Sequence, residues 1–213
     1  MPRPLTFLSF VEDVVTRAAV IRLLGSLSER YPFVTLAAGH PVVTHGNGRL
    51  KEKALKLRDA AYNGITSILV TDLDANHTPN DLGRNWFGVV CLSALPKGFL
   101  FRVAIREIEA WIMADRKGFA PYLSVSPDNF PDDSESILDP KRFLLNLIDA
   151  KCKKKRFREM LPLKGQKIGI NYNPILVDFV ENHWNIANAT LHSSSLRRAI
   201  DRIGSFLESK QSS

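Results

Sequence analysis

An Asp-x-Asp pair follows the most apolar predicted strand of the chain. Residues 65–71 are nearly all apolar or β-branched, which is typical of a strand buried on both faces, and Asp72-Leu73-Asp74 comes directly after them. Two carboxylates in one turn can be directed at a single hard cation, and oxygen-only ligands suit Mg²⁺ or Mn²⁺. Such an ion can activate water against a phosphodiester bond. The pair therefore predicts metal-dependent phosphoryl chemistry, with a solvated turn as the alternative.

A third carboxylate, Glu12, follows the first predicted strand, residues 5–11. Ligands of open parallel sheets bind beyond the carboxyl ends of the strands. We therefore expect Glu12, Asp72 and Asp74 to share one edge of the sheet as metal ligands. Asp13 is placed instead to cap the helix predicted over residues 14–30.

Two further acids lie in a helix predicted over residues 104–116. Glu109 falls on the edge of its apolar face, whereas Glu107 is expected on another side. A buried carboxylate is costly unless it is paired or bound to metal. Glu109 is thus a candidate metal ligand and catalytic acid, or one half of a structural ion pair with Arg102 or Arg106. Glu107 is a weaker candidate. Arg102, Arg106 or Lys97 is a candidate to steady the leaving phosphate.

Strands and helices alternate along the first half of the chain. The predicted strands are residues 5–11, 33–37, 65–71 and 98–103, and the predicted helices are residues 14–30, 50–62, 79–86 and 104–116. This order predicts an α/β fold with a mainly parallel sheet and helices on both faces. The loop His45-Gly46-Asn47-Gly48 either cradles a phosphate or forms a plain turn.

The composition of the chain changes after Gly118. Residues 121–140 are rich in proline and acidic residues, and their apolar residues show no helical or strand periodicity. Helical patterns follow over residues 140–150, 152–161, 174–183 and 193–208. We therefore expect two domains, a catalytic α/β domain over residues 1–117 and a helical extension over residues 118–213.

The ordered acids resemble a known family. Glu12 after the first strand and Asp72-Leu73-Asp74 after the third, in a βαβαβ frame, resemble the TOPRIM (topoisomerase–primase) domain. Residues 101–115 (FRVAIREIEAWIMAD) are similar to stand-alone bacterial TOPRIM-like proteins related to the overcoming-lysogenization-defect (OLD) nucleases. The similarity continues loosely through residues 139–141 and 171–173.

This resemblance implies a TOPRIM-like Rossmannoid sheet that binds Mg²⁺ or Mn²⁺ through Glu12, Asp72 and Asp74. In the OLD relatives further acids complete a two-metal nuclease site, which carries over to Glu107 and Glu109. It also implies a neighbouring ATPase as partner and a role in phage defence or DNA maintenance.

The first family motif, Glu-Gly-x-x-Asp/Glu, is altered here. The chain has Glu12-Asp13-Val14-Val15-Thr16, so the glycine is absent and Thr16 replaces the second acid. This departure supports a second hypothesis, a non-catalytic subunit that binds nucleic acid or an ATPase. A phosphatase with Asp72 as nucleophile is a third hypothesis, which the position of the pair after the third strand disfavours.

A dense basic run predicts a polyanionic partner. The net charge is +7, most of it after residue 115. Phosphate neutralisation supplies most non-specific affinity for nucleic acid, with DNA as the expected form, and a solvated helix face is the alternative. The cations of the run are Lys151, Lys153, Lys154, Lys155, Arg156 and Arg158.

The motifs of two enzyme classes are missing from the sequence. The Gly-x-x-x-x-Gly-Lys loop of P-loop ATPases does not occur, and neither does the Gly-x-Ser-x-Gly elbow of α/β-hydrolases. Cys91 and Cys152 are too few for a disulfide framework, and the apolar surroundings of Cys91 predict that it is buried. No run of 18 apolar residues and no signal-peptide pattern is present, so we expect a cytoplasmic protein without a membrane partner.

Overall fold

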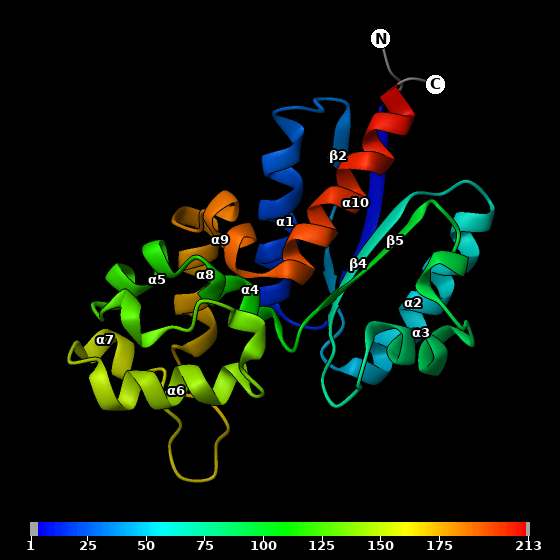
Figure 1. Ribbon diagram of the computed structural model, residues 1–213. Coiled ribbons are helices and arrows are strands. Elements are labelled where there is room, and N and C mark those ends of the chain that lie inside the picture. The colour runs from blue at the N-terminus through cyan, green and yellow to red at the C-terminus, as the bar shows by residue number, and fades with distance from the viewer. Residues whose placement is uncertain (1–3, 212–213) are drawn as a thin grey trace. The chain divides into compact units, whose positions relative to one another are not determined.

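The computed structural model describes residues 4–211, which divide into two compact units (Figure 1). The first unit holds the chain up to Ala104 together with the part from Arg198 onward, and the second is Ile105–Arg197. The expected domains, residues 1–117 and 118–213, do not coincide with these units. The chain returns to the first unit at its end, so that unit is discontinuous in sequence.

The first unit is built on a five-stranded, all-parallel sheet. Its strands are β1 (Leu5–Val11), β2 (Val34–Leu36), β3 (Val42–Val43), β4 (Ser67–Asp72) and β5 (Phe99–Ala104). The order is β2-β1-β4-β5, and β3 pairs with the end of β1. The predicted α/β class with a parallel sheet is confirmed. β3 lies between the predicted strand at residues 33–37 and the predicted helix at residues 50–62, where the sequence indicated no strand.

Helices cover both faces of this sheet (Figure 1). They are α1 (Val14–Ser28), α2 (Asn47–Tyr62), α3 (Pro79–Phe87), the short 3-10 helix η1 (Leu92–Ala94) and most of α10 (Ser194–Gln211). Phe7 of β1 meets Phe206 of α10 edge-on at 6.2 Å between ring centroids. Phe101 of β5 meets Phe87 of α3 at 5.0 Å. The first contact lies on the face of the sheet that α10 covers, and the second lies on the opposite face, which α3 covers.

The second unit is helical and has its own aromatic core. Its elements are α4 (Ile108–Ala114), α5 (Arg116–Leu123), η2 (Pro127–Asn129), η3 (Ser134–Ser136), α6 (Pro140–Lys151), α7 (Lys155–Arg158), α8 (Tyr172–Asn182), α9 (Ile186–His192) and the first turn of α10. Trp111 and Trp184 are fully buried, and the Phe119 and Phe179 rings lie 4.6 Å apart. None of the helices within residues 4–211 combines the length and apolar character needed to cross a bilayer.

Local capping explains where α1 begins. The Asp13 carboxylate accepts a hydrogen bond of 2.8 Å from the Thr16 backbone N–H, which is the geometry of an N-cap. The predicted capping role of Asp13 is confirmed. Asp13 is therefore committed to the helix, and Glu12 is the acid that remains at the end of β1.

Two predicted helices were wrong in extent. The helix expected over residues 104–116 begins only at Ile108, because Ala104 still pairs with Asp72 in the sheet and Glu107 is extended (φ −135°). The helix expected over residues 152–161 is reduced to the single turn of α7. Cys152 is extended and buried there, and its Sγ donates to the Leu123 carbonyl at 3.2 Å.

A carboxylate of the second unit holds the start of α10. Glu135 accepts hydrogen bonds from the Ser193 and Ser194 hydroxyls at 2.6 and 2.9 Å and from the Ser195 backbone N–H. Ser195 Oγ in turn accepts from the Trp111 indole at 2.7 Å. A negative charge at a helix N-terminus satisfies free N–H groups and the helix dipole together.

We expect Glu135→Ala to lower the free energy of unfolding by about 2 kcal/mol, the usual worth of hydrogen bonds to a charged group. Urea unfolding followed by circular dichroism would measure it. Glu181→Ala, an exposed acid in α8, is the matched control. Equal stability of the two variants would contradict the capping role.

Candidate functional site

The parallel pairing of β1 with β4 places two candidate ligands at one edge of the sheet. Leu8 pairs with Ser67 and Ser9 with Ile68. Extended by the same offset, this register sets Glu12 across from Thr71, one residue before Asp72. Glu12 directly follows β1, Asp72 is the last residue of β4, and both are half-buried. Glu12 follows a strand end as predicted, whereas Asp72 still belongs to its strand, one residue beyond the predicted end.

The turn at residues 45–48 is hydrogen-bonded both to Glu12 and to Asp74. The His45 backbone N–H donates to the Glu12 carbonyl at 3.0 Å. The Asn47 side-chain amide donates to Asp74 Oδ2 at 3.1 Å. The turn therefore lies beside the ends of both β1 and β4. Of the two alternatives for residues 45–48, these bonds favour a turn that holds the acids in place.

The backbone of this turn is unusual. His45 has φ 55° and Asp74 has φ 52°, both in the left-handed region that non-glycine residues rarely adopt. Gly46, at φ 134°, precedes α2 and gives it no side-chain cap. Such conformations cost free energy and persist mainly where the surrounding structure requires them, often at functional sites. Here they coincide with the end of β1 and the turn after β4.

The donor chemistry of these acids fits a divalent ion such as Mg²⁺. No group of three or more His, Cys, Asp or Glu side chains that could hold a metal is present within residues 4–211. Mg²⁺, however, usually takes one or two protein carboxylates and completes its shell with water and substrate oxygens. Glu12 and Asp72 offer two half-buried carboxylates, and Asp74 keeps Oδ1 available beside the bond from Asn47.

The remaining candidate acids gather around a lysine in the second unit. Lys141 Nζ lies 3.5 Å from Glu109 Oε1, and the Lys141 backbone N–H donates to Glu107 Oε2 at 2.9 Å. The Tyr172 hydroxyl donates to Glu109 Oε1 at 2.9 Å. The expectation that Glu107 and Glu109 point to different sides is wrong, because Glu107 precedes α4 and does not follow its helical spacing. The ion-pair partner of Glu109 is Lys141, where the sequence suggested Arg102 or Arg106.

Burial weakens the acidity of the Glu109 carboxyl group. Its side chain is 3% exposed, and Oε2 has no hydrogen-bond partner among the described residues. Burial raises the pKa of Glu109 above its usual range, and the neighbouring charge of Glu107 adds to this, while Lys141 and Tyr172 oppose it. A raised pKa brings a carboxyl group closer to the range in which it can act as a general acid.

Arg106 lies in the segment between β5 and α4 and is half-buried. Asp115, just after α4, is fully buried and has a structural role. It accepts from the backbone N–H groups of Gly118 at 3.2 Å and Asn185 at 2.8 Å. It thereby joins the start of α5 to the start of α9.

Two residues at these sites, Lys141 and Tyr172, were not predicted from the sequence as functional, and both contact Glu109. His45 and Asn47 lie in the loop predicted as a phosphate cradle or a plain turn, and they contact Glu12 and Asp74. A signal for the first two existed, because both fall in the short stretches, residues 139–141 and 171–173, where the family resemblance continues. No pattern in the sequence indicated that Asn47 would reach Asp74.

The basic run divides by residue type. Arg156 pairs with Asp178 at 2.6 Å and lies over the Tyr122 ring at 5.7 Å from its centroid. Arg158 pairs with Asp149 at 2.9 Å. The lysines of the run are all exposed: Lys151, Lys153, Lys154 and Lys155. The arginines therefore stabilise the second unit, and the lysines are available to a partner.

A hollow beside these lysines is apolar as well as basic. It has a volume of about 540 Å³, and Lys153 and Lys155 line it together with Leu163 and Ile170. The two aliphatic side chains are 72% and 87% exposed. The surface around the basic run thus offers both charge and apolar contact.

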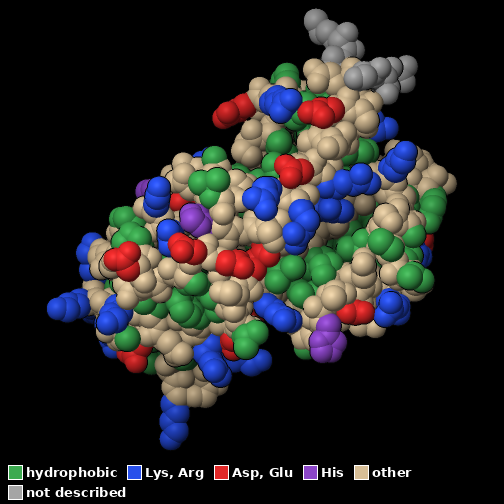
Figure 2. All heavy atoms as spheres, viewed as in Figure 1, with side chains coloured by type: hydrophobic (Ala, Val, Ile, Leu, Met, Phe, Trp, Pro, Cys, Tyr) green, Lys and Arg blue, Asp and Glu red, His purple; other side chains and the backbone are tan. Residues whose placement is uncertain are grey.

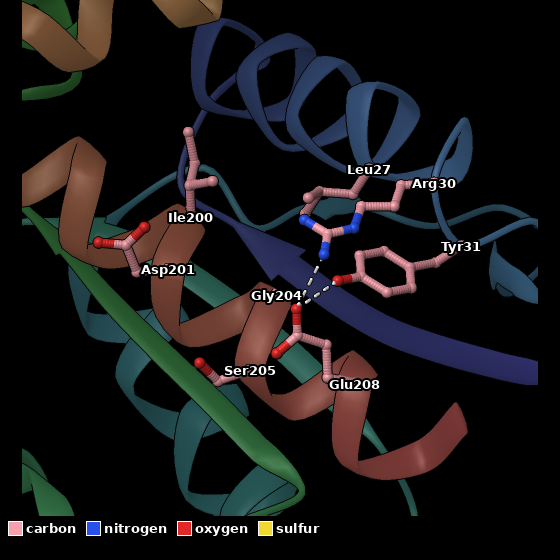
Figure 3. A pocket seen from close by; sticks show the side chains of 8 residues that line it. All are labelled: Leu27, Arg30, Tyr31, Ile200, Asp201, Gly204, Ser205 and Glu208. Atoms are coloured by element: carbon pink, nitrogen blue, oxygen red, sulfur yellow. Dashed lines mark hydrogen bonds and ion pairs between the residues drawn. The ribbon is translucent and has the colours of Figure 1, made fainter. Parts of the chain in front are cut away.

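A second hollow, of about 320 Å³, lies in the first unit where the end of α1 faces α10 (Figure 3). Arg30 and the Tyr31 hydroxyl both point at Glu208, at 3.2 and 3.1 Å. Tyr31 is 1% exposed, and burial, aided by Glu208, raises its pKa. These groups satisfy one another and hold α10 against α1.

No family model, curated protein or solved structure matches this chain. The TOPRIM resemblance therefore stays an expectation, and the argument for function rests on the residues themselves. One minor expectation was wrong: Cys91 is exposed, not buried. The Ser93 hydroxyl donates to its Sγ at 3.1 Å, which lowers the pKa of this thiol.

We expect Glu109→Gln to stabilise the metal-free protein at neutral pH. Because the folded-state pKa of Glu109 is raised, the wild type should lose stability as pH rises above the ordinary carboxyl value of 4.5. Glutamine keeps an acceptor for Tyr172, and Lys141 remains solvated because its side chain is 37% exposed. Melting curves in EDTA from pH 4.5 to neutral pH would show a flatter profile for the variant.

Glu181→Gln, at an exposed position, should leave that profile as in the wild type. A wild-type melting temperature that rises across the same range, with Glu109→Gln less stable throughout, would show that the paired, ionised form of Glu109 is the favoured one.

Proposed function

We propose that this chain is a divalent-metal-dependent nuclease that cleaves phosphodiester bonds of nucleic acid. One observation carries the proposal. The parallel register of β1 and β4 sets Glu12 and Asp72 at the same edge of the sheet, where a single turn also contacts Asp74. Three carboxylates at the carboxyl ends of parallel strands are the chemistry expected for Mg²⁺ or Mn²⁺.

Each acid has a distinct part in this proposal. Glu12 and Asp72 would hold the cation, and the bond from Asn47 orients Asp74 toward the same edge. When bound, Mg²⁺ or Mn²⁺ supplies an activated water and stabilises charge on the phosphate and the leaving oxygen. The proposal needs only the acids of the first unit. Glu107, Glu109 and Arg106 remain predicted catalytic residues.

The exposed lysines of the basic run support a nucleic-acid substrate, which we propose is DNA. Cations on a solvent-exposed surface attract the phosphate backbone without regard to sequence. With the family resemblance, they support a cytoplasmic nuclease that works beside an ATPase in phage defence or DNA maintenance.

A second candidate function has its own observation. Thr16, which stands where the family motif has its second acid, is 3% exposed within α1. The position at which the family motif has its second acid therefore carries no carboxylate. This supports a non-catalytic subunit that binds nucleic acid or an ATPase and keeps the sheet without the reaction. Nothing of this kind favours a phosphatase.

Cleavage of plasmid, linear duplex and single-stranded DNA and RNA with Mg²⁺, Mn²⁺ or EDTA tests the nuclease proposal. Asp72→Asn should abolish metal-dependent cleavage and weaken Mg²⁺ binding measured by calorimetry, because it removes one ligand charge. Glu52→Gln, an exposed acid on α2, should behave as the wild type.

The outcomes separate the candidates. Cleavage that persists in Asp72→Asn with unchanged metal dependence would refute the assigned site. DNA binding without turnover, in EDTA and Mg²⁺ alike, would favour the non-catalytic subunit. A covalent phosphate trapped on Asp72 would instead identify a phosphatase.

Replacing Lys151, Lys153, Lys154 and Lys155 together by Gln should weaken DNA binding and flatten its salt dependence. Each phosphate that the variant no longer neutralises should reduce the slope of log K against log salt by about 0.9 for duplex DNA. Fluorescence anisotropy over a salt series measures this.

Arg156→Gln should have the opposite profile, a lower melting temperature with a nearly unchanged slope, because its guanidinium is paired with Asp178. A large reduction of the salt slope in Arg156→Gln, with none in the lysine variant, would contradict this assignment. It would show that the arginine binds DNA and that the lysines do not.

A further inference from the structure

Arg102 occupies an unusual place on the sheet. Arg102 lies in β5 and pairs with Val70 of β4. Two residues earlier on these strands, Leu100 pairs with Ile68, which pairs in turn with Ser9 of β1. Side chains alternate along a strand, so Phe7, Leu100 and Arg102 share one face of the sheet. Phe7 contacts Phe206 of α10. Arg102 therefore points to the face that α10 covers, away from the aromatic cluster around Phe101.

Arg202 is the charged neighbour of Arg102 on this face. It lies one turn before Phe206 on α10, so the two share one side of the helix. Burial, and then the positive charge of Arg202, lowers the pKa of Arg102 to about 10. The charge of Arg202 therefore acts on this guanidinium by repulsion.

Neither arginine has a protein partner among the described residues. Arg102 Nε is buried and has no hydrogen-bond acceptor, and no ion pair within residues 4–211 involves Arg102 or Arg202. Arg156 and Arg158 in the second unit, by contrast, are paired with Asp178 and Asp149. A partly buried charge without a counter-charge is costly, so the arrangement leaves a place for an anion.

The surface view agrees with this placement. Figure 2 shows Lys and Arg side chains gathered over the strip of the first unit where α10 and β5 lie. Asp72 is on the same face of the sheet as Arg102, because its register partner Ala104 lies two residues beyond Arg102 on β5. The cations and the candidate metal ligand therefore belong to the same end of the same face.

We propose that Arg102 and Arg202 form an oxyanion site that binds a phosphate group, which in the nuclease function is a phosphate of the nucleic-acid backbone. The planar guanidinium presents parallel N–H donors that match phosphate oxygens, and Arg202, being exposed, can close over the anion. The identity of the phosphate as part of nucleic acid rests on the proposed function, whereas the site itself does not.

The first arm of the test uses inorganic phosphate and the whole protein. In EDTA at constant ionic strength, phosphate should raise the melting temperature of the wild type above that in chloride. Arg102→Gln and Arg202→Gln should each abolish this shift. Lys210→Gln, which removes an exposed charge from the same helix, should keep it. Without phosphate, Arg102→Gln should melt no lower than the wild type, because the charge it removes has no partner.

The second arm identifies the source of the phosphate. Binding of a labelled single-stranded oligonucleotide in EDTA should weaken in both arginine variants, and the salt slope should fall by about 0.7 for each backbone phosphate that is no longer neutralised. Lys210→Gln should show neither change. Disappearance of the phosphate shift with unchanged oligonucleotide binding would overturn the backbone assignment and leave a site for a free phosphate compound.

Two results would overturn the oxyanion site itself. One is a wild type whose melting temperature is the same in phosphate and chloride. The other is a phosphate shift that persists in Arg102→Gln. Asp72→Asn separates this proposal from the nuclease, because it should abolish cleavage yet keep the phosphate shift.

Discussion

β1 and β4 are hydrogen-bonded parallel neighbours, and this pairing sets the geometry of the candidate site. Parallel strands end at the same edge, so the residues that follow β1 and close β4 share that edge although 60 positions separate Glu12 from Asp72. A parallel sheet must be covered on both faces, which favours apolar residues along its strands. The acids lie at the strand ends, where a charged group can reach water, and Arg102 is the charged exception within a strand. The turn at His45 and Asn47 then restricts their freedom at a cost in backbone conformation.

Charge in the first unit is arranged in two complementary parts. Carboxylates stand at the end of the sheet, and unpaired guanidinium groups stand on the face beneath α10. Cleavage of a phosphodiester would use both groups. The carboxylates would hold a metal ion, and that ion and the arginines would bind oxygens of the same phosphate backbone. The second unit treats the same residue type differently. There Arg156 lies between Asp178 and the Tyr122 ring, and its role is to hold α7 to α8. An arginine therefore has to be judged by what surrounds it.

The strands and the acids that follow them could be predicted because their signals are local. The apolar run before Asp72 and the cap formed by Asp13 depend on residues next to them in sequence. The start of α4 could not be predicted, because the pairing of Ala104 with Asp72 keeps the chain extended beyond the point where the helical pattern begins. Glu107 was misplaced for the same reason. The contacts of Lys141 and Tyr172 with Glu109 join residues 32 and 63 positions apart, and no periodicity reports such a pairing. Arg102 was expected either to pair with Glu109 or to steady a phosphate, and the absence of a carboxylate beside it within residues 4–211 is a property of the fold.

The discontinuous first unit has a consequence for how the protein is made. A ribosome that has released residues up to Arg197 has produced every strand of the sheet, yet most of α10 is still to come. Until then Phe7 lacks its contact with Phe206, and Tyr31 lacks Glu208. Domains usually fold as units during synthesis, so this unit must wait for the end of the chain while the inserted helical unit is already complete. Until the last fourteen described residues are made, the nascent sheet would expose the apolar face that α10 covers in the finished α/β unit.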